Sequence, residues 1–322
     1  MYIYPGLNGS SPQHLTNVNG VLFFQANDNA NGRELWKSDG TEAGTVMVKD
    51  IYPGLNNHAN PFYLKNINGA LFFQAYEDNN GSELWKSDGT EAGTVMVKDI
   101  WQGGGHSSPA YIMEMNGMAF FSANDGKNGS ELWKSDGTAA GTSIVMDYSS
   151  IASNPSRLTE MNGTLFFQAN DDVHGEELWK SDGTEAGTVL VKDISPGGSG
   201  ALSSSYQFIP VNNNLFFKAD NDSHGTELWK SDGTEAGTVM VKDIEAAGSD
   251  SDPDYLVNVN GILFFNANGS SIGRELWKSD GTEAGTVMVK DIYAGTNSSA
   301  PQYLTNVNDM LFFVATNGIN GT

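Results

Sequence analysis

The residues best suited to chemistry are oxygen-bearing side chains that gather in short polar loops recurring along the chain. Five of these loops place Asp or Glu beside Asn, as in the run Asn27-Asp28-Asn29. Clustered carboxylate and amide oxygens suit Ca²⁺, which takes roughly six to eight hard oxygen ligands. The acids that make up this predicted metal site are Asp28, Asp78, Asp125, Asp171, Asp172, Asp220 and Asp222.

Turn formation is the alternative interpretation of the same loops. Their spacing is not the EF-hand pattern, and Asp and Asn side chains also hydrogen-bond to their own backbone in ordinary turns. One equivalent loop, Asn268-Gly269-Ser270, contains no acid. We therefore expect no required cofactor, and Ca²⁺ is the ion that these loops would accommodate.

The remaining charged residues do not indicate a catalytic centre. The chain has no cysteine, which excludes thiolate catalysis and zinc–thiolate sites. Three unrepeated charged residues, Glu114, Arg157 and Glu160, interrupt segments that are otherwise alike. Two carboxylates converging on a central channel would be the minimum for acid–base chemistry. Because repeated scaffolds tolerate drift at such positions, we predict that the chain is not an enzyme.

A second set of acids recurs within the sequence SDGT, in six copies from Asp39 to Asp280. A catalytic acid is not needed six times, so we expect Asp-Gly to form a turn while the Ser and Thr hydroxyls satisfy nearby backbone groups. The repeated Glu of ELW and Asp of VKDI are expected to pair across strands with lysines of the Lys37 and Lys49 type. Exposed ion pairs of this kind contribute little to stability.

The net charge of the chain limits the kinds of molecule that it can bind. The 322 residues include 39 acidic and 17 basic side chains, a formal net charge of −22. This charge argues against nucleic acid and against an anionic membrane surface. No apolar run reaches the length needed to span a bilayer, and the N-terminal sequence shows no signal peptide. We predict no nucleic-acid partner and no membrane insertion.

These residues belong to an internal repeat. The octapeptide ELWKSDGT occurs six times, at spacings of 49, 48, 46, 50 and 48 residues. A second marker, LFFxA or AFFxA, occurs seven times. Its first residues are Leu22, Leu71, Ala119, Leu165, Leu215, Leu263 and Leu311. A period of this length is typical of propeller blades.

Each repeat predicts four strands, A to D, of the types 14–19, 21–26, 34–38 and 46–51. An Asn-Gly pair such as Asn19-Gly20 predicts the A–B hairpin turn. Strand B is apolar on both faces, as in a blade buried between neighbours. We predict an all-β chain, residues 1–322, forming a single β-propeller domain of four-stranded antiparallel blades. Seven blades, six complete and one A–B half-blade, are expected; the alternative is six blades and a protruding half-blade.

The variable B–C and D–A loops are expected on one face of the propeller, because the A–B and C–D turns occupy the other. Four histidines lie in these loops, together with Trp101, which is the one Trp outside the octapeptide. Loops on a rigid scaffold commonly carry function, so this face is the candidate recognition surface, with glycans as candidate ligands. Random drift of loop sequences is the competing explanation.

The segment G-x-ELWKSDGT-x-x-GT-x-x-V-x-DI resembles the ELWxxDGT repeat family of bacterial surface and secreted proteins. The resemblance covers essentially the whole chain and departs from the pattern at Asp147-Tyr148. It implies an extracellular or cell-surface propeller used as a scaffold, an adhesin or a filament component. It implies no defined catalytic residues.

The last repeat has an A–B hairpin without a C–D hairpin, which predicts an open strand edge. Residues placed at this predicted assembly site are Ile3, Tyr4, Leu311, Phe312 and Phe313. The functional hypothesis is a non-enzymatic extracellular structural protein that assembles with other copies of itself, a neighbour's strands completing the open blade. The alternative is an adhesion module that binds glycans or Ca²⁺ through the variable loops.

Overall fold

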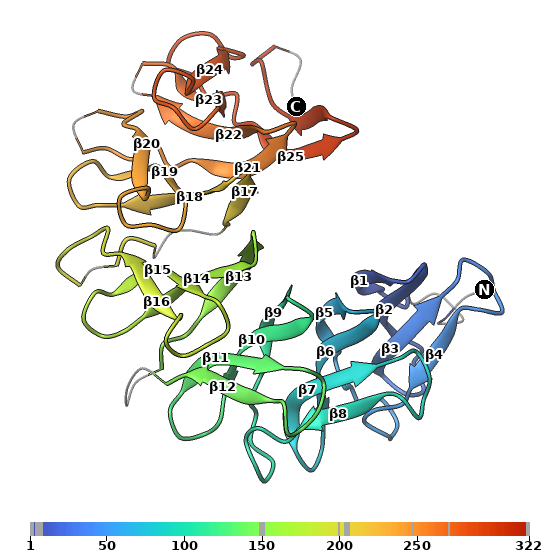
Figure 1. Ribbon diagram of the computed structural model, residues 1–322. Helices are drawn as coiled ribbons and strands as arrows, with labels where there is room; N and C mark the ends of the chain where they lie inside the picture. The colour runs from blue at the N-terminus through green and yellow to red at the C-terminus, as the bar shows by residue number, and fades with distance from the viewer. Residues whose placement is uncertain are drawn as a thin grey trace. The chain divides into compact units, whose positions relative to one another are not determined.

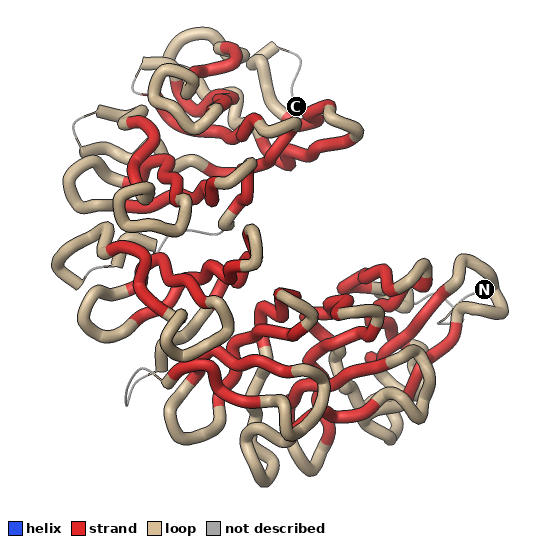
Figure 2. The backbone as a smooth tube through the Cα atoms, viewed as in Figure 1, coloured by secondary structure: helices blue, strands red, loops and turns tan. Residues whose placement is uncertain are grey.

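The structure, a computed structural model, describes residue 3 and residues 9–147, 152–198, 200–202, 207–246, 248–269 and 271–319 (Figure 1). All regular elements in these ranges are β-strands, and loops connect them (Figure 2). No helix in the described ranges is long and apolar enough to cross a membrane.

The strands fall into six four-stranded antiparallel sheets and one two-stranded sheet. We call these sheets blades 1 to 7 in chain order. Blades 1 to 3 are β1 Gln13–Val18, β2 Val21–Asn27, β3 Arg33–Ser38 and β4 Val46–Lys49; β5 Phe62–Ile67, β6 Ala70–Glu77, β7 Gly81–Ser87 and β8 Val95–Lys98; β9 Ala110–Met115, β10 Met118–Asn124, β11 Ser130–Ser135 and β12 Ser143–Met146. Blades 4 to 7 are β13 Ser156–Met161, β14 Thr164–Asn170, β15 Glu176–Ser181 and β16 Val189–Lys192; β17 Ile209–Val211, β18 Asn214–Asp220, β19 Thr226–Ser231 and β20 Val239–Lys242; β21 Asp254–Val259, β22 Ile262–Gly269, β23 Gly273–Ser279 and β24 Val287–Lys290; β25 Gln302–Val307 and β26 Met310–Val314.

Within each complete blade the strands are hydrogen-bonded in sequence order, A–B–C–D. Repeated four-stranded antiparallel blades confirm the predicted β-propeller fold, and a count of about seven blades fits. The predicted D strands are shorter than expected, since β4 ends at Lys49.

The A–B turns form as the Asn-Gly pairs predict. Asn19 and Gly20 both have positive φ, 52° and 85°, the backbone of a type I′ hairpin turn. The Asn17 side chain accepts a hydrogen bond from Gly20 N–H at 2.9 Å. Each turn therefore needs only local residues, which explains why it recurs so regularly.

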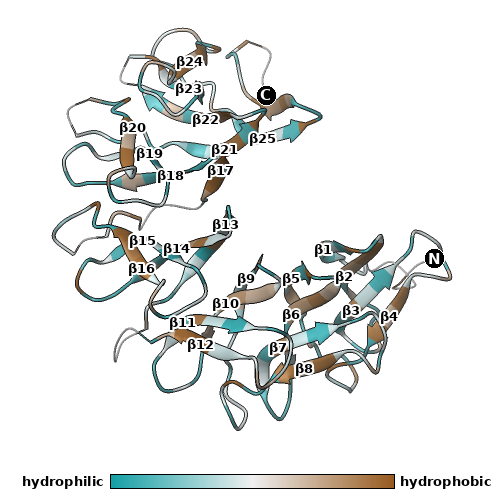
Figure 3. Ribbon diagram, viewed as in Figure 1, coloured by the Kyte–Doolittle hydropathy of each residue, from teal (hydrophilic) through white to brown (hydrophobic). Residues whose placement is uncertain are grey.

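Apolar residues run along strands such as β8 and β17 (Figure 3), and they pack consecutive blades face to face. Phe23, Leu35 and Val48 of blade 1 form one buried cluster with Phe73 and Trp85 of blade 2. The same arrangement recurs between blades 2 and 3 and between blades 5 and 6. Leu35 and Trp36 point to opposite faces, as predicted, because Trp36 belongs to a different cluster.

The repeated lysines link consecutive blades through backbone carbonyls, so the predicted pairing of ELW glutamates with lysines is wrong. Lys37 Nζ donates to Gly89 O at 2.7 Å, and Lys49 Nζ donates to Thr94 O at 2.8 Å. Equivalent bonds join Lys134 to Gly183, Lys180 to Gly233, Lys230 to Gly281, Lys98 to Thr142, Lys192 to Thr238 and Lys242 to Thr286. The acceptors are one repeat away, which a pattern within one repeat does not reveal.

The chain forms two compact units. The first comprises Met1–Leu165 with Ser181–Thr188, and the second comprises Phe166–Lys180 with Val189–Thr322. Blades 1 to 3 belong to the first unit and blades 5 to 7 to the second, while blade 4 contributes residues to both. The assignment of residues 1–322 to a single domain stays a prediction.

Candidate functional site

The D–A loops are anchored by the glutamate that opens each ELWKSDGT motif. Glu34 is fully buried, and its carboxylate accepts hydrogen bonds from Ile51 N–H at 2.9 Å and Ala59 N–H at 3.0 Å. In blade 2, Glu83 accepts from the backbone and hydroxyl of Ser107 at 3.2 and 2.6 Å. In blades 1 and 2 one buried carboxylate thus accepts hydrogen bonds from backbone groups at both ends of the D–A loop.

Burial also changes the titration of these glutamates. Desolvation raises the pKa of Glu34 to about 8, although hydrogen bonds from Ile51 and Ala59 act in the opposite direction. Desolvation likewise raises the pKa of Glu131 and of Glu177 to about 7. The removal of a carboxylate from water outweighs the donors that surround it.

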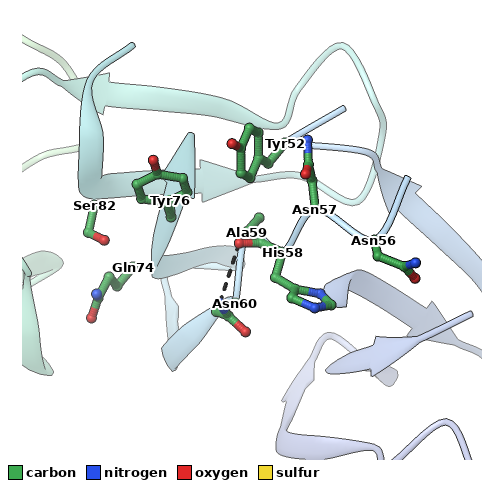
Figure 4. A pocket seen from close by; sticks show the side chains of 9 residues that line it. All are labelled: Tyr52, Asn56, Asn57, His58, Ala59, Asn60, Gln74, Tyr76 and Ser82. Carbon is green, nitrogen blue, oxygen red and sulfur yellow. Dashed lines mark hydrogen bonds between the residues drawn. The ribbon is translucent and has the colours of Figure 1, made fainter. Parts of the chain in front are cut away.

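A pocket of about 480 Å³ opens where the loop between blades 1 and 2 meets the strands of blade 2 (Figure 4). We call it the tyrosine–amide pocket. Its lining comprises Tyr52, Asn56, Asn57, His58, Ala59, Asn60, Gln74, Tyr76 and Ser82. D–A loop and B–C strand ends therefore meet on one face, as the sequence predicts. All nine side chains are aromatic, amide, imidazole, hydroxyl or methyl groups, so the lining carries no carboxylate, ammonium or guanidinium.

Aromatic rings form one wall of the pocket. Tyr52 and Tyr76 meet edge to face with ring centroids 5.1 Å apart, and Tyr76 stacks on His106 at 5.7 Å. The Tyr52 hydroxyl lies 3.4 Å from Asp78 Oδ1. Desolvation, with the nearby Asp78 charge, raises the pKa of Tyr52 above its ordinary value.

The loop side of the pocket is fixed by hydrogen bonds. Arg33 N–H donates to His58 Nδ1 at 2.8 Å, which places the imidazole proton of the neutral ring on Nε2. Asn57 Nδ2 donates to Pro53 O at 2.9 Å, and Asn60 Nδ2 donates to His58 O at 3.3 Å. Bonds within the loop thus orient the Asn57 and Asn60 amides, and the first residue of β3 orients the His58 imidazole.

A short side chain, Ser82, borders the pocket in blade 2. Ser82 occupies the position that is Arg33 in blade 1 and Arg274 in blade 6. In blade 6 the arginine reaches Asn266 Oδ1 at 2.7 Å. Ser82 is too short to make such a contact, and Gln74 is half-buried whereas the equivalent Gln25 is only 4% exposed. The amide of Gln74 therefore faces the pocket.

The acids of the predicted metal site mostly cap their own turns. Asp28 Oδ1 accepts from Ala30 N–H at 3.0 Å and Asn31 N–H at 2.8 Å, and Asp125 does the same for Lys127 and Asn128. Similar partners surround the others: His174 for Asp171, Asp222 N–H for Asp220, Ser195 for Asp222 and Tyr52 for Asp78. Asp172 adopts a left-handed turn conformation, φ 66°. Among the described residues no three His, Asp or Glu side chains gather as a metal site. Ca²⁺ binding stays a prediction.

The unrepeated acids of the A strands also cap turns. Glu114 Oε1 accepts from Gly117 N–H at 2.7 Å, and Glu160 Oε1 accepts from Gly163 N–H at 2.7 Å. They replace the Asn17-type amide that caps the same turn in blade 1. Arg157 has the positive φ, 55°, shared by His14 and Tyr63 at the same bulge. The two glutamates thus have a structural role in their turns.

One segment of the sixth repeat has the residue spacing of a catalytic serine motif. Gly269-Ser270-Ser271-Ile272-Gly273 has the spacing G-x-S-x-G. A nucleophile elbow needs this sequence between a strand and a helix. Here the two glycines end β22 and begin β23 and pair with each other in one antiparallel sheet, with Ile272 N–H bonded to Gly269 O at 3.0 Å. The context is therefore not that of a nucleophile elbow.

The predicted assembly residues lie in different surroundings. Ile3 packs beside the Phe24 and Trp36 cluster, and Tyr4 lies outside the described residues. Leu311 is partly buried, whereas Phe312 and Phe313 are 53% and 37% exposed.

Comparison with known proteins identifies the fold. No family model and no curated protein sequence matches the chain, so its membership of the ELWxxDGT repeat family stays a prediction. Similar solved structures include a puromycin hydrolase mutant complexed with PGG, at 14% identity and a TM-score of 0.52 over 95% of this chain and 50% of that chain. A prolyl endopeptidase matches at 13% identity with a TM-score of 0.53, and the match covers 95% of this chain and 46% of that chain. Prolyl oligopeptidase B from Galerina marginata matches at 11% identity with a TM-score of 0.51, covering 88% of this chain and 42% of that chain.

These comparisons correct the functional prediction. The chain spans about half the length of the proteins it matches. Those proteins are a hydrolase and peptidases, so the prediction of a structural protein that forms surface or filament-like assemblies, with an adhesion module as the alternative, is corrected. That the chain is not an enzyme, and that it is extracellular, stay predictions. Because the identities are below 15%, the likeness itself establishes the propeller fold and not an activity of this chain.

Proposed function

We propose that the chain is the propeller module of a peptidase-related protein, and that its tyrosine–amide pocket binds an extended, uncharged peptide segment. The observation that carries the peptide-binding proposal is the composition of the pocket, which is neutral in a chain of net charge −22. The peptidase setting is supported by the structures that share the fold. In this proposal peptide-bond cleavage belongs to a separate catalytic domain.

A peptide suits the groups that line the pocket. The Gln74 amide offers a donor and an acceptor in one plane, which matches the C=O and N–H of a peptide unit. The edge-to-face pair Tyr52 and Tyr76 offers apolar ring surface and hydroxyl groups, a combination enriched at recognition sites. The nine lining side chains themselves offer no counter-charge to a charged peptide side chain, and burying an unpaired charge is unfavourable.

The substitution Ser82→Arg tests the site by returning the residue found in blades 1 and 6. Its side chain should fill the pocket and bond to Gln74, as Arg274 bonds to Asn266. Calorimetry with the probe Ac-Ala-Pro-Gly-Pro-Ala-NH₂ should show affinity at least tenfold lower for Ser82→Arg than for the parent protein. The matched control is Ser130→Arg at the equivalent position of blade 3, which should bind as the parent does.

A second variant removes the aromatic wall without disturbing the repeat. Tyr76→Asn restores the residue present at Asn27, Asn124 and Asn170, so we expect normal folding and weaker binding. The proposal is overturned if the parent protein gives no heat with the peptide, or if Ser82→Arg and Ser130→Arg lose affinity equally. Binding of chitotetraose in place of the peptide would also overturn it.

A further inference from the structure

The A–B turns of blades 3 and 4 differ from the others in the group that holds the amide of the turn glycine. Glu114 Oε1 accepts a hydrogen bond from Gly117 N–H at 2.7 Å, and Glu160 Oε1 accepts one from Gly163 N–H at 2.7 Å. In blades 1, 2 and 6 the acceptor, at 2.9 to 3.0 Å, is the side-chain oxygen of an asparagine: Asn17, Asn66 or Asn258. A carboxylate is a stronger base than an amide, so blades 3 and 4 place a base on the glycine N–H.

The asparagine of the blade 3 turn, Asn116, is also less restrained than its counterpart in blade 2. Asn68 Nδ2 donates to Gly117 O at 3.1 Å, which ties the Asn68 amide to the turn of the next blade. Asn116 has no hydrogen-bond partner among the described residues, and nothing lies within 4 Å of a Cβ built at Gly163, where the equivalent contact would be. Because Asn116 is exposed, its amide is free to approach the backbone of its own turn.

Blade 6 offers a turn of the same shape with a neutral cap. The turn Asn116-Gly117 has φ values of 51° and 80°, and the turn Asn260-Gly261 has φ values of 52° and 78°. In both turns the glycine carbonyl accepts a hydrogen bond from an asparagine of the preceding blade. Asn260 is likewise exposed and has no hydrogen-bond partner among the residues that the structure describes. The two turns therefore differ mainly in the cap, which is Glu114 in one and Asn258 in the other.

We propose that Asn116 is a site of spontaneous deamidation, with the Glu114 carboxylate as the general base. Glu114 removes the proton from Gly117 N while that nitrogen attacks Cγ of Asn116, an approach that no Cβ on the glycine hinders. The new N–Cγ bond closes a succinimide ring, the Cγ–Nδ2 bond breaks, and the proton leaves with the released ammonia. Water then opens the ring at either carbonyl carbon, which leaves aspartate or isoaspartate in the turn.

Capping the turn does not by itself require a carboxylate, because asparagine oxygens cap the same turn in three other blades. The distance of 2.7 Å from Glu114 Oε1 to Gly117 N lies within the reach of a general base. A positioned base accelerates a proton-transfer step by roughly 10²–10⁴-fold. The site lies in an A–B turn, is separate from the tyrosine–amide pocket and does not depend on the function proposed for that pocket.

Ageing the whole chain at neutral pH tests the proposal. Peptide mapping by mass spectrometry should show that the amide of Asn116 is converted to a carboxyl at least about tenfold faster than that of Asn260, with isoaspartate among the products. Asn68 should react more slowly still, because its amide is tied to Gly117 O. In protein unfolded with urea the caps are lost, so the rates at the three asparagines should converge.

Two reciprocal variants separate the base from the cap. Glu114→Asn installs the residue that caps the turns of blades 1, 2 and 6, so the variant should fold normally while the rate at Asn116 falls to that of Asn260. Asn258→Glu should raise the rate at Asn260 about tenfold and leave Asn116 unchanged. Equal rates at Asn116 and Asn260 in the folded chain, or an unchanged rate at Asn116 in Glu114→Asn, would overturn the proposal. So would a difference of the same size that persists in urea, because it would come from the neighbouring sequence.

Discussion

The two ends of strand C carry acids of opposite character, although both belong to one motif. At one end Glu34 is fully buried against the D–A loop, and its pKa is raised to about 8 by desolvation. At the other end Asp39 is exposed in the C–D turn, and hydrogen bonds from the hydroxyl and backbone of Thr41 lower its pKa. Both carboxylates accept two hydrogen bonds, so the difference in burial explains why the pKa of Glu34 is raised and the pKa of Asp39 is lowered.

The comparison teaches that repetition alone does not define the role of an acid. The exposed Asp shapes a local turn together with Ser38 and Thr45, whose hydroxyls lie 2.7 Å apart. The buried Glu instead fixes a loop that lies more distant in the sequence and that forms part of the tyrosine–amide pocket. One acid maintains the scaffold turn, whereas the other positions the candidate site.

Removing a buried glutamate should have the largest effect. Glu83→Ala leaves the backbone N–H groups of Ile100 and Ser107 without their acceptor. Each buried group left unsatisfied costs roughly 1–3 kcal/mol, so we expect a loss of about 3 kcal/mol in the free energy of unfolding. Urea denaturation measures the change. Glu91→Ala, in an exposed turn of the same blade, is the control and should leave the midpoint nearly unchanged.

The same burial predicts a pH dependence of stability. The carboxyls of Glu34, Glu131 and Glu177 have an ordinary pKa of 4.5 when unfolded and pKa values of about 7 to 8 when folded. Between these values the folded chain binds more protons than the unfolded chain, so the free energy of unfolding falls as pH rises. We expect a lower Tm at pH 8 than at pH 5.5. The turn aspartates have lowered pKa values and lose their contribution only in acid.

Replacing the three glutamates tests the origin of this slope. The triple variant E34Q/E131Q/E177Q removes the titrating groups, so its Tm should vary less between pH 5.5 and pH 8. A slope as steep as that of the parent protein would show that other groups control the pH dependence.

The exposed acid should give the smallest effect. Asp88→Ala removes the acceptor for Thr90 N–H and the Thr90 hydroxyl, at 2.8 and 2.7 Å, but water can replace it at this site. We expect a smaller decrease in the urea midpoint than for Glu83→Ala, and a still smaller one for Asp88→Asn, which keeps the Oδ1 acceptor. A decrease equal to that of Glu83→Ala would contradict the assignment of Asp88 to a local turn.

Much of the fold follows from local patterns. The Asn-Gly pairs, the apolar B strands and the Asp-Gly turns each depend on neighbours a few residues away, and the structure has them as predicted. The lysine pairing was wrong because Lys37 reaches Gly89, in the following repeat. The G-x-S-x-G sequence illustrates the opposite case, since its meaning depends on the hairpin that surrounds it.

The sequence predicted a recognition surface on the variable-loop face, but it did not predict which residues form the pocket. The sequence places Tyr52, Gln74 and Ser82 in or next to variable loops, yet nothing local indicates that they converge. The signal that would have found the pocket is the comparison of equivalent positions, because Tyr76 and Ser82 both differ from their counterparts in blade 1. A short side chain such as Ser82 contributes to the pocket by leaving space that a longer side chain would fill.

The repeat, the four strands of each blade and the turns that join them can be predicted from sequence, because hairpin pairing and turn formation depend on short-range contacts. Packing between repeats sets which acids are buried, which carbonyls the lysines reach and where a pocket opens. These properties depend on packing between segments about one repeat apart, such as Arg33 against His58 and Lys49 against Thr94. Burial, and with it the pKa of a repeated glutamate, is set by that packing.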